Sequence, residues 1–245
     1  HRSIESRDED AMWSPVSRDI PGFLTQMGVA YGIRDLSTSR NLELLPSFTA
    51  VRAGSLDTST GSYTTADLAP DAGLNVKYGL SSNLTIDATF NPDFSQIEAD
   101  RPQITVNQRF PIFISEQRPF FLEGQELFSI GLVNLMHTRS IVDPRFGAKL
   151  TGKVGRTSVG LLAANDEGPG NTTDLSDPAF ERKAAFLVGR VRYDYGAESY
   201  VGGLVTDREF LNTHNRVAAI DGRFKLSPTN RLSAVVATSN DLDGA

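Results

Sequence analysis

The chain of 245 residues has no cysteine, one tryptophan and three histidines. Without cysteine it can form neither disulfide bonds nor thiolate metal sites. His1, His137 and His214 stand too far apart for metal-ligand spacing, which argues against a zinc site. A Gly-x-Ser-x-Gly elbow, a phosphate-binding loop and a dinucleotide fingerprint are missing as well. We therefore expect no enzymatic constellation, no cofactor and no metal.

Long apolar runs are also absent. Apolar residues make up 39% of the chain, and no stretch approaches the roughly eighteen consecutive apolar residues that a membrane-spanning helix needs. This argues against a helical membrane protein. The net charge is −6 and the 24 Lys and Arg residues are dispersed, so the chain offers no basic footprint for nucleic acid.

What the sequence does contain is short segments in which apolar and polar residues alternate. The most regular one is Gly73–Phe90, where the alternation continues on both sides of the turn Ser81-Ser82-Asn83. This pattern predicts a β-hairpin with one apolar and one polar face. Further strands are expected at Leu42–Arg52, Val133–Ile141, Phe146–Val154, Thr157–Asn165, Ala184–Tyr195, Tyr200–Asp207, Arg216–Leu226 and Arg231–Ser239.

The expected connections alternate between tight turns such as Gly155-Arg156 and longer polar loops such as Ala53–Pro70 and Asp166–Arg182. Arg208–Asn215 is predicted as a loop of intermediate length. This alternation is typical of outer-membrane barrels. We therefore predict an all-β fold, an antiparallel up-and-down transmembrane β-barrel, of which the chain holds the N-terminal part. Residues 1–40 are expected to be a connector or the tail of a preceding periplasmic module, and residues 41–245 the barrel strands.

In several predicted strands the charged residues occupy alternate positions and so share one face, which predicts the face that lines the lumen. Lys149 and Lys153 share one face of their strand, and Lys on the lipid side costs roughly 2–4 kcal/mol near the bilayer midplane. The same reasoning assigns to the lumen Arg190, Arg192 and Asp194, and Asp221, Arg223 and Lys225. Tyr193, Tyr195 and Tyr200 are expected in an interfacial aromatic girdle. An ordinary soluble antiparallel sheet would show the same alternation.

Residues 91–132 break the pattern, with many Phe, Pro and acidic residues in the runs Asn91–Asp100 and Phe110–Gly124. These runs and the hairpin before them resemble an uncharacterised family of bacterial outer-membrane β-barrel proteins, known only as a domain of unknown function. In that family the barrel typically follows a periplasmic module resembling family-nine carbohydrate-binding domains. The resemblance covers nearly the whole chain and implies a location in the outer membrane of a Gram-negative bacterium. It assigns no activity to any residue.

The irregular segment is the candidate luminal motif. Its unpaired backbone groups could not face lipid, so we expect it to fill the lumen as a plug or constriction. The residues proposed for this motif are Asp93, Glu98, Asp100, Glu116, Arg118, Phe120, Phe121 and Glu123. Arg118 is expected to pair with Glu116 or Glu123 and with backbone carbonyls. The phenylalanines expected to pack together are Phe110, Phe113, Phe120, Phe121 and Phe128. An inert plug and a gating or ligand-contacting segment remain alternatives.

The direction of the strands yields a topological prediction. Leu84–Phe90 and Val133–Ile141 are both expected to run outward, so an odd number of crossings must lie between them, with Gln103–Phe110 the best candidate. Ser82 and Arg156 should lie on one side of the membrane. Ser59 and Thr172 should lie on the other.

The function that these expectations favour is an outer-membrane channel or solute-binding and uptake barrel. Its partners would be membrane lipid and carbohydrate-derived or other small solutes. One alternative is an envelope carbohydrate-active hydrolase whose carboxylates, Asp93 or Glu98 among them, lie in the acidic motif. Another is a soluble antiparallel β-sheet binding module.

Overall fold

The computed structural model describes residues 2–4, 9–11, 31–32, 41–52, 54–92, 94, 116–196 and 198–242. The chain divides into two units, His1–Ser39 and Arg40–Ala245. In the first unit, β1 (Arg2–Ile4) pairs with β2 (Glu9–Ala11) in a short antiparallel ladder.

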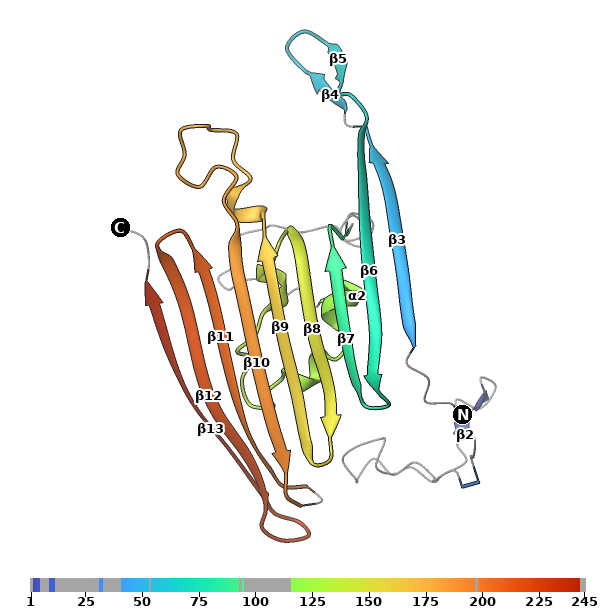
Figure 1. The fold of residues 1–245 in the computed structure, drawn as a ribbon, viewed down its shortest axis with the longest axis vertical. Coiled ribbons are helices and arrows are strands. Elements are labelled where there is room, and N and C mark those ends of the chain that lie inside the picture. The colour runs from blue at the N-terminus through green and yellow to red at the C-terminus, as the bar shows by residue number, and fades with distance from the viewer. Residues whose placement is uncertain are drawn as a thin grey trace. The chain divides into compact units, whose positions relative to one another are not determined.

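The second unit is built on one antiparallel sheet (Figure 1). Its strands, in chain order, are β3 (Leu42–Val51), β6 (Ala69–Ser81), β7 (Leu84–Phe90), β8 (Pro144–Val154), β9 (Thr157–Asp166), β10 (Ala184–Asp194), β11 (Tyr200–Phe210), β12 (Thr213–Lys225) and β13 (Arg231–Leu242). Each strand pairs with its neighbours in sequence, as in an up-and-down meander. A separate hairpin, β4 (Gly54–Asp57) and β5 (Ser62–Thr65), stands between β3 and β6. The all-β antiparallel prediction is confirmed. Within the described residues the sheet is not closed, because β3 and β13 form its two edges.

The connections differ in length between the two ends of the sheet. At one end, called the turn end, β6–β7, β8–β9, β10–β11 and β12–β13 are joined by short turns. At the other, called the loop end, residues 91–143 and 167–183 form long connections. The register places Ser82 and Arg156 at the turn end, with Ser59 and Thr172 at the loop end. That these two ends lie on opposite sides of a membrane stays a prediction. The loop predicted at Arg208–Asn215 is wrong, because the two strands continue until only Leu211 and Asn212 separate them.

The two faces of the sheet differ in chemistry. The inner face is the one against which residues 116–141, called here the inner segment, are packed. It carries the charged groups that the sequence assigned to one face, including Lys149, Arg190 and Asp221. The outer face is apolar and exposed, with large side chains at Leu44, Phe48, Ile86, Phe90, Leu161, Leu187, Val191, Val205, Ile220 and Val236.

The three tyrosines predicted to form one aromatic girdle do not share a face of the sheet. Tyr193 lies on the outer face and is partly exposed, and Tyr195 contacts the outer-face ring of Phe224 at 6.4 Å between centroids. Tyr200 instead lies on the inner face, because its cross-strand neighbours are the inward residues Asp194 and Arg223. The three tyrosines are close in sequence, but the turn between β10 and β11 places Tyr200 on the face opposite to Tyr193 and Tyr195.

The strand predicted at Val133–Ile141 is wrong. The segment contains only an isolated bridge between Ile130 and Val133 and the 3-10 helix η4 (Thr138–Ser140). Its consecutive residues Leu135 and Met136 both pack against the core, whereas a strand would send them to opposite faces. Because β7 pairs directly with β8, the extra crossing is not required in the sheet. The proposed crossing Gln103–Phe110 lies outside the described residues.

The core lies between the inner segment and the inner face. From the segment come Phe120, Phe121, Phe128, Ile130 and Ile141, and from the sheet come Leu162, Ala164, Val188, Leu204 and Ala219. The helical elements are short: α2 (Pro119–Leu122), η3 (Gln125–Leu127), η4 and η5 (Gly168–Gly170). Among the described residues, no helix has the length and apolar character needed to cross a membrane.

Candidate functional site

Two phenylalanines of the inner segment rest on glycines of the sheet. A Cβ added to Gly147 of β8 would lie 2.9 Å from ring atoms of Phe120, and one added to Gly160 of β9 would lie 2.9 Å from Phe128. Such distances are too short for a real side chain, so glycine at these inward positions makes room for the two rings. The sheet is therefore shaped to receive the segment.

Arg118 binds several parts of the inner segment together. Its Nε and Nη2 donate to the two carboxylate oxygens of Glu116 at 2.9 and 2.8 Å, and the Thr138 hydroxyl donates to the same carboxylate at 2.6 Å. Its Nη1 and Nη2 also donate to the carbonyl oxygens of Ile141 and Thr138 at 2.6 and 2.9 Å. The guanidinium lies 4.3 Å from the ring centroid of Phe121. These contacts connect the start of the segment to its end.

This cluster is fully buried: the side chains of Arg118 and Glu116 are 1% and 2% exposed. Burial opposes ionisation of the Glu116 carboxyl, but hydrogen bonds from Arg118 and Thr138 outweigh it and lower the pKa to about 2. The Glu116 carboxylate is thus ionised at neutral pH. A buried pair of this kind stabilises only as long as both partners are present.

The depressed pKa predicts how the segment responds to acid. A carboxyl whose pKa falls from 4.5 to about 2 on folding contributes its full stabilisation above pH 4.5 and loses it as the pH drops toward 2. We expect the inner segment to become accessible to pepsin over this interval. Arg118→Ala should abolish this pH dependence, since the carboxyl then loses its main partner. A segment equally protected at pH 5 and pH 2 would contradict the prediction.

Lys149 of β8 anchors the segment to the sheet. Its Nζ is buried and donates to the carbonyl oxygens of Phe120 and Glu123, each at 2.6 Å. The carboxylate of Asp87 on β7 lies 3.7 Å away. The short helix α2 cannot satisfy its own last carbonyls, and the ammonium group takes over that role.

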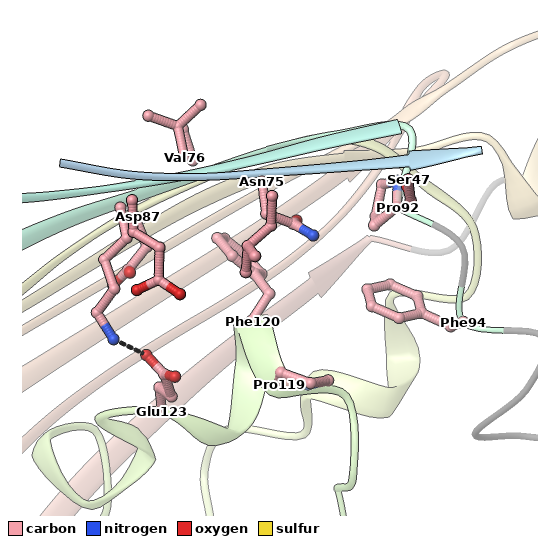
Figure 2. A pocket seen from close by; sticks show the side chains of 13 residues that line it. Ser47, Asn75, Val76, Asp87, Pro92, Phe94, Pro119, Phe120 and Glu123 are labelled. Atoms are coloured by element: carbon pink, nitrogen blue, oxygen red, sulfur yellow. Dashed lines mark hydrogen bonds and ion pairs between the residues drawn. The ribbon is translucent and has the colours of Figure 1, made fainter. Parts of the chain in front are cut away.

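A cavity of about 200 Å³ lies between the sheet and α2. Figure 2 shows Asn75 and Asp87 from the sheet on the same side as Phe120, Glu123 and Phe94, while Val76 points to the opposite side. The carboxylates in the lining are Glu43, Asp87 and Glu123, and the ammonium group is that of Lys77, which pairs with Glu123. Phenylalanine and proline rings supply the apolar part of the lining. The cavity can therefore hold a small molecule that combines polar groups with an apolar surface.

The structure brings the described residues of the predicted motif together. Glu116, Arg118, Phe120 and Phe121 form one cluster, and Glu123 lies beside it in the cavity wall. Of the two partners predicted for Arg118, Glu116 is confirmed, whereas Glu123 pairs with Lys77. Phe128 joins the same apolar cluster. The predicted residues outside the described part of the chain are Asp93, Glu98, Asp100, Phe110 and Phe113.

Sequence reasoning placed Lys149 on the luminal face, but it did not connect Lys149, Lys77 or Asp87 with the luminal motif. The sequence feature that could have identified them is the charged residues at the alternate, inward-facing positions of β6, β7 and β8. His137, predicted inside a strand, instead precedes η4. Within the described residues, no group of three or more His, Cys, Asp or Glu side chains is placed to hold a metal ion.

One comparison with known proteins gives a match. Residues 40–154 are similar to a family described as a domain of unknown function (DUF5916). The matched stretch runs from β3 through β8 and includes the inner segment with the cavity beside it. No curated protein and no solved structure matches the chain.

Proposed function

We propose that the nine-stranded sheet is part of the wall of a β-barrel in the bacterial outer membrane, and that the inner segment narrows the lumen of a channel or solute-uptake barrel. The observation that carries this proposal is the outer face. Ile220, Val236 and Val205 are 72%, 77% and 54% exposed, and comparable apolar side chains continue across the sheet. Soluble monomers rarely expose an apolar patch of this extent, whereas lipid would cover it.

The strand lengths and the ends of the outer face support the same proposal. Most strands have 10 to 13 residues, close to the 9–11 or so that a tilted strand needs to cross a bilayer. Charged residues on the outer face gather at the loop end, where Arg216 binds Asp207 and Glu209. Tyr193 and Tyr195 lie near the turn end, where an aromatic belt would meet the opposite interface.

The inner segment supports a fixed constriction. Arg118 connects its two ends, Lys149 joins it to β8, and Lys77 joins it to β6. The segment is thus attached to the sheet by a buried ammonium group on β8 and by a partly exposed ion pair to β6, and these two attachments limit its freedom to swing aside. The cavity beside it, with its carboxylates and aromatic rings, is then the place where a passing solute, carbohydrate-derived or of another small kind, contacts the wall.

Single cysteines test this proposal, because the chain has none of its own. In intact cells and in isolated outer membranes, a membrane-impermeant maleimide should label Ser59→Cys and Thr172→Cys from outside. It should reach Ser82→Cys and Arg156→Cys only when the inner side is open. Labelling of all four positions from one side, or a monodisperse protein without detergent, would contradict the proposal and favour a soluble sheet module.

A further inference from the structure

Basic side chains outnumber carboxylates on the inner face at the turn end. The basic residues are Lys153 of β8, Arg192 of β10, Arg223 and Lys225 of β12 and Arg231 of β13, and the carboxylates that pair with some of them are Asp194 and Glu198. The nearby carboxylate of Asp221 is paired with Arg190. The turn end of this face therefore carries net positive charge, although the whole chain is acidic.

The ion pairs at the turn end account for every one of these basic residues except Arg223. Lys153 and Arg192 share Asp194, and Lys225 and Arg231 share Glu198. Hydrogen bonds from Lys225 and Arg231 hold the pKa of the Glu198 carboxyl below its usual range, so it stays ionised and committed to these partners. Among the described residues, Arg223 has no carboxylate partner.

Tyr200 organises the two arginines. It lies on β11 between Asp194 of β10 and Arg223 of β12. The guanidinium carbon of Arg192 lies 4.6 Å from the ring centroid of Tyr200, and that of Arg223 lies 5.7 Å from it. Both distances are within the range of a cation–π contact, which holds each guanidinium at the ring without using its N–H donors.

The donors that remain suit an anionic group. Arg223 is exposed and its N–H groups have no acceptor beyond solvent among the described residues. Arg190, two residues from Arg192 on the same face, is buried; its Nη1 and Nη2 donate to the carboxylate of Asp221, and its Nε–H has no acceptor among the described atoms. Guanidinium groups present a planar fork of donors that matches the oxygens of carboxylate and phosphate.

We propose that Arg192, Tyr200 and Arg223 form a binding site for the oxyanion group, carboxylate or phosphate, of a small solute at the turn end of the inner face. That a solute reaches this site through a lumen rests on the proposed function. Binding of the oxyanion at the site does not depend on it. The site lies on strands β10–β12, apart from the cavity formed by β3, β6, β7 and α2, so the inner face offers a cationic contact as well as an acidic one.

The test measures binding of inorganic phosphate and of acetate to the purified full-length protein at constant ionic strength. Binding is followed through broadening of the anion's own NMR signal, 31P or 13C. Arg223→Gln is expected to weaken binding of the preferred anion about tenfold, because it removes charge-assisted hydrogen bonds. Broadening by phosphate alone identifies a phosphate-bearing solute, and broadening by both identifies oxyanions in general.

Arg208→Gln is the matched control. Arg208 lies on the same face of β11, at the loop end, with its guanidinium carbon 5.6 Å from the ring centroid of Phe186. This variant removes the same charge and the same kind of contact, and it should leave anion binding unchanged. Arg223→Lys keeps the charge and should bind the oxyanion more weakly while folding normally.

Equal losses in Arg223→Gln and Arg208→Gln, or equal competition by chloride, would overturn the proposed site. Failure of the barrel proposal has a different signature. In that case the cysteine labels at Ser59 and Thr172 would not be confined to one side, while the effect of Arg223→Gln on anion binding would persist.

Discussion

Replacing Arg118 by alanine is expected to lower the free energy that holds the inner segment in place by about 3–5 kcal/mol. The substitution removes the two hydrogen bonds from the guanidinium to the Glu116 carboxylate. It also removes the two hydrogen bonds from the guanidinium to the carbonyl oxygens of Thr138 and Ile141. Glu116 would remain buried with a negative charge and only Thr138 and backbone N–H groups to bind it. Native-state proteolysis measures this free energy, because cleavage follows the population of the open segment.

Arg216→Ala is the matched control for this prediction. Arg216 also binds two carboxylates, those of Asp207 and Glu209, but at an exposed position, so its loss should cost less than about 1 kcal/mol. A double variant, Glu116→Leu with Arg118→Met, should cost less than Arg118→Ala because no unpaired charge is left. If the double variant is the more harmful of the two, packing rather than charge is what Arg118 provides.

Replacing Ile220 by lysine is expected to impair membrane assembly at a cost of roughly 2–4 kcal/mol. Ile220 lies in the middle of β12 on the outer face and is 72% exposed. In a soluble sheet, lysine at such an exposed position would be tolerated and would improve solubility. In the proposed barrel, the same side chain would place its ammonium group in the hydrocarbon layer. The measurement is the yield of folded protein in lipid vesicles at increasing urea concentration.

Ser239→Lys serves as the control for Ile220→Lys. Ser239 is exposed on the neighbouring strand β13 and lies opposite Val217 on the inner face. The same charge there would face the lumen and should leave assembly unchanged. Two lysine variants that assemble equally well would remove the main support for a lipid-covered outer face.

The strands were predictable because two different environments act on alternate residues. In β8, Lys149 and Thr151 face the inner segment while Ala148 and Leu150 face outward, and a sequence pattern of period two records this directly. The pattern failed where polar residues pair across strands. The polar run Arg208–Asn215 resembles a loop, yet both strands continue through most of it, and Arg216 binds the carboxylates of Asp207 and Glu209 across β11 and β12.

The sequence predicted which residues of the inner segment pack together, but it did not predict the secondary structure of the segment or its contacts with the sheet. The sequence predicts a strand through Leu135, Met136 and Ile141, because a buried irregular segment and a short strand have similar apolar content. The pairing of Arg118 with Glu116 was accessible since the two residues are close in sequence. The contacts of Glu123 with Lys77 and of its carbonyl with Lys149 join distant parts of the chain, and no local pattern encodes them.

The position of the inner segment between β7 and β8 has a consequence for the order of folding. Every other neighbouring pair from β6 to β13 is close in sequence, whereas β7 and β8 meet only after residues 91–143 have been looped out. Closing that loop costs the most chain entropy, so β3–β7 and β8–β13 should form first as separate meanders. The inner segment contacts both, through Lys77 on one side and Lys149 on the other. A substitution that weakens the docking of this segment should therefore slow the pairing of β7 with β8. The folded structure itself would be less affected than this rate of folding.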